Sequence, residues 1–504
     1  MSLRSFTLFD LYRRNASCIP ERTAVVSEQG ALSYSELEGK ARSLAGGLTA
    51  RGVGKGDRVA VLARNNDHFL PLFGAASALG AILVLINRRL SLDEIEHIIG
   101  DTDPKLLLLE SELRDQADRL MRCSPDMDKH YLMDDLSKSE SSMLALEQEP
   151  IHEEPVFISG DDPLMIIHTA AMQGKPRGAV LSQHNLILAN LQIITALGLD
   201  RESCYLNILP LFHIMGINLA LAVMQAGGKN VLMPAFDAHQ AIQLIRQEEV
   251  SLLGTFPPIL SNLLEARQEA QEELASLKQV LGLESQETIE KLQSTTPSRF
   301  WCMYGQTETS GLITFAPYQE GPGSAGQPGH LTELRIKDDQ DRDVPIGQKG
   351  EIVVRGPLVF QGYWNAEDLT AVTFREQWHH TGDLGTLDES GFLFFSGRKA
   401  EKELIKSGGE NVFPVEVEKA ILEHPEVAAV SVFGVPDPTF GEGIKAVCVL
   451  GRDSSLSKEE LIRYVASKIA SYKKPRYVEF VASLPLKEDG SVDREAVKAQ
   501  YGGQ

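Results

Sequence analysis

Residues 169–178, TAAMQGKPRG, are the first stretch whose residue types could bind an anion. An apolar run over 164–167 predicts a buried strand before them, and a helix-like segment over 183–197 follows. A small-residue turn between a strand and a helix can point backbone N–H groups at a phosphate, and Lys175 and Arg177 add cations. The stretch lacks the spacing of a P-loop, so alone it does not separate a phosphate loop from an ordinary turn.

Four further segments carry complementary chemistry. The sequence YGQTE at 304–308 places an aromatic ring, a hydroxyl and a carboxylate in one turn. These groups can stack on a base, donate to a phosphate and hold Mg²⁺. HTGD at 380–383 offers a carboxylate on a glycine turn, suited to a ribose diol, while Arg398 adds a fixed cation. His213 lies among apolar residues. Taken singly, each of these features is more often structural.

Composition and charge restrict the class of protein. The 504 residues predict two to four domains, and a formal charge of −21 argues against nucleic acid or an anionic membrane as the main partner. Five scattered cysteines without a C-x-x-C pair predict reduced thiols in the cytoplasm and no structural zinc. Cys302 is interpreted as a buried core residue rather than a nucleophile. The uncharged run over 69–87 predicts a buried helix and a strand, and no transmembrane segment is expected.

Hydrophobic periodicity predicts an α/β fold. A helix is expected over 32–52, capped at Ser33 or Ser35, and solvated helix over 266–292. Short buried strands separated by helices predict parallel sheets covered on both faces. The predicted strands are 58–63, 81–86, 105–109, 164–167, 231–233 and 252–256. From 332 onward short strands with tight turns predict a small β-rich subdomain, and the last hundred residues predict a compact α+β domain.

Taken together and in this order, the segments resemble the adenylate-forming superfamily, in particular AMP-forming acyl-CoA synthetases, over essentially the whole chain. The matching segments are SYSEL at 33–37, PLFHIMG at 210–216, YGQTE at 304–308, GYWN at 362–365, HTGDLG at 380–385, KELIKSGGENVFPVEVE at 402–418 and GVPDPTFGE at 434–442. The resemblance implies a large N-terminal domain over 1–397 of mostly parallel sheets flanked by helices, with the β-rich subdomain at about 332–397. A small α+β lid domain over 398–504 would follow a hinge at about 398–406.

The resemblance also implies a two-step reaction. ATP with Mg²⁺ would activate a carboxylic acid as acyl-AMP, and CoA would then displace AMP to give acyl-CoA. A lid that presents two faces in turn lets one pocket run both steps. The expected substrate is a nonpolar carboxylic acid, fatty or alicyclic, because the residues expected near the acyl group include no Lys or Arg. A homodimer is one assembly compatible with the sequence.

The resemblance implies roles for individual residues. Thr307 would contact the α-phosphate, Glu308 with Thr169 would hold Mg²⁺, and Tyr304 would stack on adenine. Lys402 would be the hinge and, with Thr307, Glu308, Arg177 and Lys487, forms the predicted catalytic set. The predicted nucleotide and CoA contacts are Thr169, Gly174, Lys175, Tyr304, Gly305, Gln306, Thr307, Asp383, Arg398, Gly408 and Gly409. The predicted acyl contacts are His213, Gly216, Phe256, Gly282, Leu283 and Gly311.

The chain departs from the family pattern at phosphate contacts. The loop hydroxyls of the family are replaced by AAMQ at 170–173, and its lysine by Arg177. In LPLKEDGSVDR at 484–494, Ser491 stands where the family has the lysine that bridges the carboxylate and the α-phosphate; Lys487 or Lys498 would have to substitute. Two hypotheses follow: an active synthetase with rearranged phosphate contacts, or a non-catalytic or half-reaction homologue that binds nucleotide or acyl-CoA but adenylates poorly.

Overall fold

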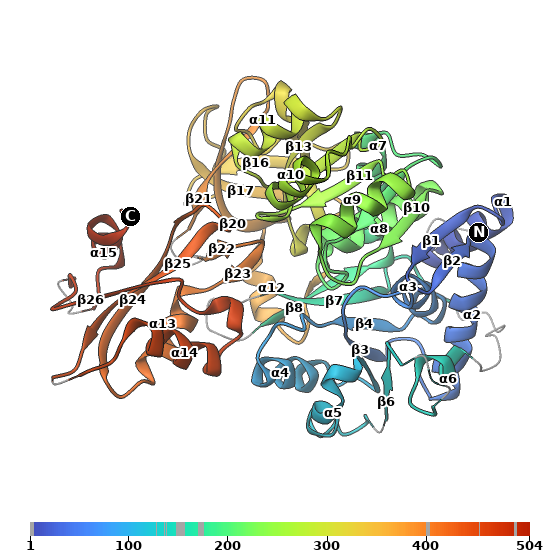
Figure 1. Ribbon diagram of the computed structural model, residues 1–504, viewed down its shortest axis with the longest axis horizontal. Coiled ribbons are helices and arrows are strands. Elements are labelled where there is room, and N and C mark those ends of the chain that lie inside the picture. Colours follow the sequence, from blue (N-terminus) through green and yellow to red (C-terminus); the bar gives the residue numbers. More distant parts are fainter. Residues whose placement is uncertain are drawn as a thin grey trace.

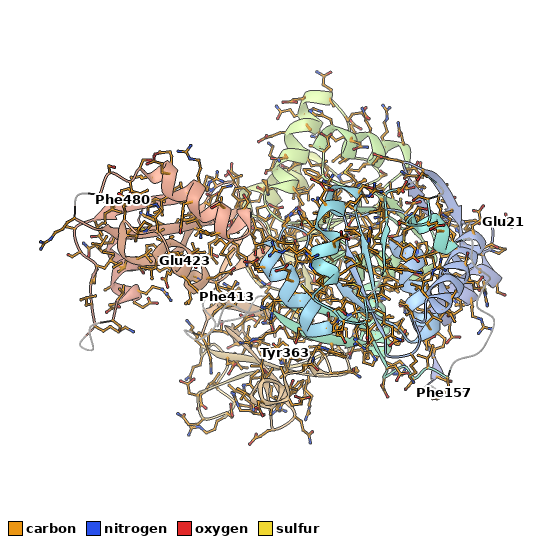
Figure 2. All side chains as sticks on the ribbon, turned by 90° about the horizontal axis from the view of Figure 1, so that it is seen from below. Glu21, Phe157, Tyr363, Phe413, Glu423 and Phe480 are labelled. Carbon is orange, nitrogen blue, oxygen red and sulfur yellow. The ribbon has the colours of Figure 1, made fainter. Side chains whose placement is uncertain are left out.

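The computed structural model shows a large body with a smaller lobe at one end (Figure 1). It describes residues 5–127, 129–135, 137, 139–147, 157–169, 176–399, 404–452, 454–487 and 491–503. Helix α1 (Leu8–Cys18) lies at the far end of the body, and the C-terminus lies in the lobe. Seen from below, Phe413 lies nearer to the body than Phe480, so the lobe projects from one side (Figure 2). The predicted α/β class, with a large N-terminal and a small C-terminal domain, is confirmed.

A seven-stranded sheet forms the first part of the body. Its strand order is β18-β8-β7-β4-β3-β5-β6, and the run from β7 to β6 is parallel. The strands are β3 (Arg58–Leu62), β4 (Ile82–Leu85), β5 (Leu106–Leu109), β6 (Lys129–Leu132), β7 (Pro163–Thr169), β8 (Arg177–Ser182) and β18 (Gly362–Tyr363). Val59 and Val61 of β3 enter one hydrophobic cluster, whereas Ala60 and Leu62 enter another. Both faces of the sheet are therefore covered, as its continuous apolar strands require.

The helices of this region follow the predicted pattern. They are α2 (Tyr34–Ala50), α3 (Phe69–Leu79), α4 (Leu92–Thr102), α5 (Arg114–Met121) and α6 (Met143–Glu147). Ser33 caps α2 by accepting the N–H of Glu36, which confirms the predicted cap. The apolar run over 69–87 is the buried helix α3 followed by β4, with Gly80 in the left-handed conformation between them. Among the described helices, none is both long enough and apolar enough to cross a membrane.

A nine-stranded sheet forms the second part of the body, in the order β15-β14-β13-β12-β11-β9-β10-β1-β2. Its strands are β1 (Thr23–Ser27), β2 (Gly30–Ser33), β9 (Cys204–Asn207), β10 (Lys229–Leu232), β11 (Leu252–Thr255), β12 (Gln279–Gly282), β13 (Arg299–Gln306), β14 (Gly311–Pro317) and β15 (Gln327–Pro328). Its helices are α7 (Gln183–Leu197), α8 (Ile214–Ala226), α9 (Ala238–Gln247), α10 (Ile259–Ala270) and α11 (Gln286–Thr295). Because β9 to β13 are parallel, their carboxyl ends meet at one edge, where ligands of such sheets bind.

Two local predictions are wrong. The stretch over 169–178 does not connect a strand to a helix, because β7 and β8 pair as an antiparallel hairpin and α7 begins only after β8. The apolar run Gly178–Leu181 extends the chain into the sheet before the helix can start. The stretch over 266–292 is not continuous helix, since the buried strand β12 lies between α10 and α11. The Val-Leu-Gly core of β12 outweighs the flanking helix-forming residues once it pairs with two neighbours.

A five-stranded antiparallel sheet forms the predicted β-rich part of the body. Its strands are β16 (Glu333–Lys337), β17 (Gly350–Arg355), β19 (Phe374–Arg375), β20 (Trp378–Leu387) and β21 (Leu393–Arg398), with α12 (Glu367–Thr373) preceding β19. The long strand β20 pairs with β17, β19 and β21. This sheet therefore carries both Asp383 and Arg398 at adjacent positions on paired strands.

The lobe is the predicted α+β lid. It contains β22 (Ile405–Ser407), β23 (Glu410–Val412), β24 (Val427–Asp437), β25 (Gly441–Leu450), β26 (Tyr477–Val481), α13 (Pro414–Leu422), α14 (Lys458–Lys468) and α15 (Arg494–Tyr501). Two clusters of buried hydrophobic residues consist entirely of residues from 405 onward. The lobe therefore has a core of its own, as a separately folded domain requires. The predicted boundary at 397 and 398 stays a prediction.

Candidate active site

The predicted nucleotide residues meet at one corner of the body. The hydroxyl of Tyr304 donates to Asp383 Oδ2 at 2.7 Å, and the amide of Gln306 donates to the same oxygen at 2.5 Å. Nε of Arg398 lies 3.6 Å from Asp383 Oδ1. Burial and the neighbouring Asp383 carboxylate hold the pKa of Tyr304 well above its usual value. Residues from β13, β20 and β21 therefore form one polar cluster with a ring, a carboxylate and a cation.

The predicted magnesium ligands also meet. Oγ1 of Thr169, at the end of β7, donates to Glu308 Oε1 at 3.2 Å, and the hydroxyl of Tyr363 donates to the same oxygen at 2.9 Å. Glu308 is 7% exposed, and within the described residues it forms no ion pair with Lys or Arg. The guanidinium of Arg177 lies over the Tyr363 ring, 5.8 Å from its centroid. A buried carboxylate of this kind, beside hydroxyl oxygens, fits a hard divalent cation.

The number of protein ligands limits how such a cation could be held. Among the described residues there is no group of three or more His, Cys, Asp or Glu able to bind a metal. Mg²⁺ commonly takes one or two carboxylates and completes its shell with phosphate oxygens and water. The arrangement of Glu308 and Thr169 therefore suits a metal that arrives with a nucleotide. Thr307, next to Glu308, begins a short 3-10 helix after β13.

The lid brings a third group of predicted residues to the same side of the body. A Cβ added at Gly409 would lie 3.2 Å from Cγ of Phe256, and one at Gly408 would lie 3.5 Å from the carbonyl oxygen of Pro257. Gly408 has a φ of 58° and Gly409 a φ of 87°. Because both angles are positive, larger side chains would be strained as well as crowded. Gly408 and Gly409 therefore lie against the Phe256–Pro257 segment of the body, and their predicted contact with CoA stays a prediction.

Polar contacts fix the lid loop in this place. Glu410 Oε1 lies 3.3 Å from Nε2 of His213 and 3.1 Å from Nη1 of Arg89, and Asn87 donates to Glu410 Oε2 at 3.1 Å. Burial alone would raise the pKa of Glu410, but His213 and Arg89 hold it below its usual value. Lys406 Nζ lies over the Phe256 ring, 5.7 Å from its centroid, and burial lowers its pKa to about 8.

The predicted acyl glycines have a packing role. A Cβ at Gly216 would lie 2.4 Å from the carbonyl oxygen of Pro210, and one at Gly282 would lie 1.8 Å from the carbonyl oxygen of Thr255. At Gly311 it would lie 2.5 Å from Nδ2 of Asn218. Gly305, predicted as a nucleotide contact, is crowded in the same way, because a Cβ there would lie 1.9 Å from the carbonyl oxygen of Gly311. The side-chain directions of these glycines are filled by protein atoms. Their backbone contact with substrate stays a prediction.

Leu283 and Glu284 follow β12 at the edge where the parallel strands end. Leu283 is 38% exposed. Thr255 Oγ1 donates to Glu284 Oε1 at 2.7 Å, and burial raises the pKa of Glu284 to about 7. The Glu284 carboxylate is therefore hydrogen-bonded to Thr255 of β11 and to the backbone of Leu260 at the start of α10.

Three of the predicted residues, Gly174, Lys175 and Lys402, lie outside the described residues. Lys487 is exposed, and its N–H donates to the carbonyl oxygen of Ser491 at 2.8 Å. Helix α15, which follows this turn, lies at the outer end of the lobe in Figure 1. Among the described residues, no hydrogen bond or ion pair joins Lys487 to Thr307 or Glu308.

Several site residues escaped the sequence analysis. Tyr363 lies in the matched segment GYWN and Lys406 in KELIK, so both were within recognised motifs but had no role attached. Arg89 and Asn87 lie in no recognised motif. Their place in the site is evident only because both contact Glu410 of the lid. Phe395 also had no signal; its ring lies 6.5 Å from that of Tyr304 and is 43% exposed.

The match to known proteins covers nearly the whole chain. A family described as AMP-binding enzyme matches residues 12–364, and the AMP-binding enzyme C-terminal domain matches residues 416–490. The chain belongs to the AMP-binding enzyme family. The family match, together with relatives at 32% identity that are CoA ligases or synthases, makes it an AMP-forming acid–thiol ligase.

Three relatives show how similar this AMP-binding enzyme is to others. A feruloyl-CoA synthase of an Amycolatopsis species is 32% identical over 97% of this chain and 98% of its own length. A Rhodopseudomonas palustris structure assigned as a long-chain-fatty-acid CoA ligase is 41% identical, with a TM-score of 0.75 over 79% of this chain and 100% of its own. An o-succinylbenzoate CoA synthetase from Bacillus subtilis is 28% identical, with a TM-score of 0.85 over 97% of both chains.

Proposed function

We propose that this enzyme joins a nonpolar carboxylic acid to CoA by way of acyl-AMP. The observation that carries the proposal is the docking of Gly408, Gly409 and Glu410 of the lid against Phe256 and His213 of the body. A glycine pair that closes on the acyl side leaves space for a thin chain such as pantetheine and no space for bulkier lid side chains.

In the first step, a carboxylate oxygen of the acid attacks the α-phosphorus of ATP, and pyrophosphate leaves. Asp383 accepts hydrogen bonds from the ribose hydroxyls, Arg398 supplies a fixed cation beside it, and Tyr304 presents its ring to the base. Thr307 donates to the α-phosphate. Glu308 and Thr169 supply oxygen ligands for Mg²⁺, which when bound offsets the negative charge that the two approaching anions bring together.

In the second step, the CoA thiolate attacks the acyl carbonyl carbon, and AMP leaves with both electrons of the C–O bond. Gly408 and Gly409 line the approach of the thiol, and His213 is held toward the acyl group by Glu410. Lys406 adds a positive charge near Phe256 that favours the leaving phosphate. We assign the lid orientation of this structure to the second step, with Lys402 in the predicted hinge at about 398–406 and the body at about 1–397.

The substrate proposal is a fatty or alicyclic acid. The stretches expected beside the acyl group, 213–217, 255–259 and 310–313, hold no Lys or Arg to read a second carboxylate. The relatives named for ferulate and o-succinylbenzoate make aryl acids the alternative class. A panel of aliphatic, alicyclic and aryl acids, assayed for AMP release with CoA present, separates them. Preference for an aryl acid would replace this substrate class, and no AMP release with any acid would contradict the reaction.

A second candidate function is an enzyme tuned away from adenylation. The observation that favours it is Ser491, together with the loss of loop hydroxyls over 170–173. Comparison of ATP–pyrophosphate exchange with thioester formation from a supplied acyl-AMP distinguishes the two. Fast thioester formation with slow exchange would favour this second function.

The proposal also includes the cellular compartment and the assembly of the enzyme. All five cysteines are free thiols, which suits the reducing cytoplasm. A homodimer is one assembly compatible with the sequence, and sedimentation velocity tests it directly.

A further inference from the structure

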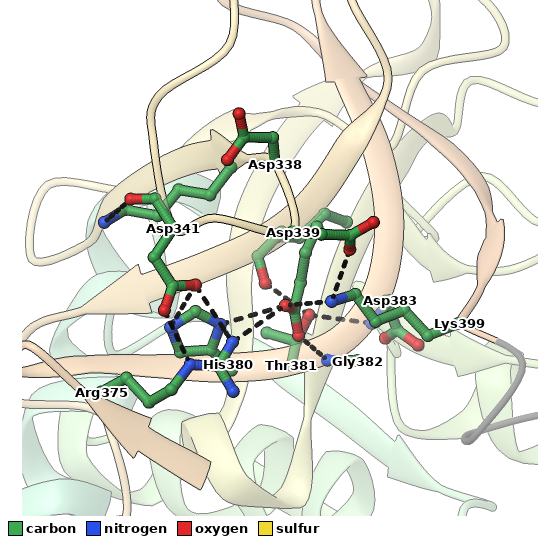
Figure 3. A network of polar contacts seen from close by, with 12 residues as sticks. Asp338, Asp339, Asp341, Arg375, His380, Thr381, Gly382, Asp383 and Lys399 are labelled. Atoms are coloured by element: carbon green, nitrogen blue, oxygen red, sulfur yellow. Dashed lines mark hydrogen bonds and ion pairs between the residues drawn. The ribbon is translucent and has the colours of Figure 1, made fainter. Parts of the chain in front are cut away.

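Glu351 is a buried carboxylate directly behind Asp383, and no step proposed above uses it. It lies on β17, and its side chain is 4% exposed. Its Oε2 lies 3.0 Å from Nδ1 of His380 and 2.9 Å from Nζ of Lys399, while the N–H of Gly382 donates to Oε1 at 3.0 Å. In Figure 3, dashed lines from His380, Gly382 and Lys399 converge on one carboxylate.

The strand that carries Asp383 is irregular at this point. The pairing of β17 with β20 passes from Val353 opposite His380 to Glu351 opposite Leu384, so β20 contains two extra residues. Such a bulge removes N–H groups from the ladder, and Gly382 takes the left-handed φ of 69° within it. A buried N–H needs an acceptor, and the Glu351 carboxylate provides it.

The same carboxylate reaches the other strand of the nucleotide corner. Lys399 follows Arg398 directly, and its own N–H donates to the carbonyl oxygen of Gly382 at 3.0 Å. Both Asp383 and Arg398 therefore have a sequence neighbour fixed to Glu351. Nη2 of Arg375, from β19, approaches the same Oε2 at 3.5 Å. One carboxylate on β17 thus contacts β19, β20 and the residue that directly follows β21, behind the cluster of Asp383 and Arg398.

We propose that Glu351 is a positioning residue for nucleotide binding: by holding Gly382 and Lys399, it sets the direction in which Asp383 and Arg398 face the ribose. This inference rests on the proposed assignment of Asp383 to the ribose. Glu351 does not touch the nucleotide. Its effect reaches the ligand through the bulge. A change at Glu351 should therefore alter the binding of the ribose more than the binding of the carboxylic acid or CoA.

The first experiment compares Glu351→Gln with Glu333→Gln as a matched control. Glu333 lies on β16 of the same sheet but pairs with Arg335 and Arg355 at the surface. With ATP in pyrophosphate exchange, Glu351→Gln should raise the KM for ATP about tenfold, because a charge-assisted hydrogen bond is lost behind the site. Its KM for the carboxylic acid should stay unchanged. Glu333→Gln should match the wild type.

The second experiment uses the ribose itself as the probe. The wild type should discriminate against 2′-deoxy-ATP and 3′-deoxy-ATP, and Glu351→Gln should lose most of that discrimination. A general loss of stability would lower activity with all three nucleotides alike. In a background of Asp383→Asn, adding Glu351→Gln should cause little further loss, because the two residues act through one contact.

The outcomes are separable. Unchanged KM for ATP and unchanged discrimination in a folded Glu351→Gln protein would overturn the proposal. If that variant does not fold, Lys399→Gln keeps the Gly382 contact and should show a smaller shift in the same direction; no shift would also overturn it. If the wild type uses ATP, 2′-deoxy-ATP and 3′-deoxy-ATP equally well, both the ribose assignment of Asp383 and this inference are overturned. A wild type without exchange would contradict the proposed function instead.

Discussion

Lys473 of the lid is buried against Glu94 of the body, with its side chain only 2% exposed. The ammonium group also contacts Glu416 Oε1 of the lid at 2.6 Å, so one cation joins two carboxylates across the domain interface. Burial raises the pKa of Glu416, as expected for a carboxylate that has left water. This contact and that of Glu410 with His213 hold the lid in its observed orientation.

Lys473→Ala should therefore weaken docking of the lid. Removal of the cation leaves two buried carboxylates without their partner, and breaking a buried pair in this way costs about 3–5 kcal/mol. Thioester formation from a supplied acyl-AMP should slow strongly, while pyrophosphate exchange should change little. Lys468→Ala is the control, because Lys468 pairs with Glu423 at the lid surface. Equal loss of both half-reactions would show that Lys473 does not act through this docked state.

Glu410→Gln should also act on the second half-reaction. The amide keeps the shape of the side chain but cannot form the ion pairs with His213 and Arg89. A hydrogen bond to a charged group is worth about 1.5–3 kcal/mol, so thioester formation should fall by about ten- to a hundredfold. Quenched-flow measurement of each half-reaction checks this. Unaltered thioester formation would mean that the contact is dispensable.

Glu308→Gln should act on the first half-reaction. Loss of the carboxylate removes the only charge offered to Mg²⁺ by the cluster of Thr169, Glu308 and Tyr363, and pyrophosphate exchange should fall by about a hundredfold or more. Tyr363→Phe removes one hydrogen bond and should cost about tenfold. A titration with Mg²⁺ should show that Glu308→Gln needs more metal. Identical Mg²⁺ dependence in wild type and variant would refute the metal role.

Ser491→Lys tests whether this chain lacks an adenylation cation. In the observed lid, the N–H of Lys487 donates to the carbonyl oxygen of Ser491. We expect the added lysine to serve adenylation after the lid has rotated. Pyrophosphate exchange should rise, by about tenfold or more, with thioester formation unchanged. Lys487→Ala is the companion variant: a strong loss of exchange would show that Lys487 already serves this step, and no gain in Ser491→Lys would agree with it.

Glu351 should contribute stability that depends on acidity. Burial would raise its pKa, but His380 and Lys399 lower it from 4.5 to about 2. Because the folded pKa is lowered, this contribution is complete above pH 4.5 and is lost as the pH falls toward 2. The full contribution is roughly 3 kcal/mol. Urea unfolding of wild type and Glu351→Gln should show their largest difference in the free energy of unfolding at neutral pH and a shrinking difference below pH 4. A constant difference would contradict the lowered pKa.

Local pattern was sufficient for most secondary structure. The strand over 58–63 and the helix at 183–197 follow from local apolar patterns, which depend on neighbours in the chain. The hairpin of β7 and β8 and the strand β12 were missed, because each forms only when partner strands outweigh local preference.

The candidate site divides in the same way. Motifs in the sequence determined the chemistry of Tyr304, Glu308 and Asp383 and the family to which the chain belongs. Only the tertiary structure decided that Tyr304 bonds to Asp383, that Tyr363 shares Glu308 with Thr169, and that the lid closes on His213. These contacts join residues far apart in the chain. Their geometry depends on strand register, a bulge and domain docking, and none of these can be predicted from neighbouring residues in the sequence.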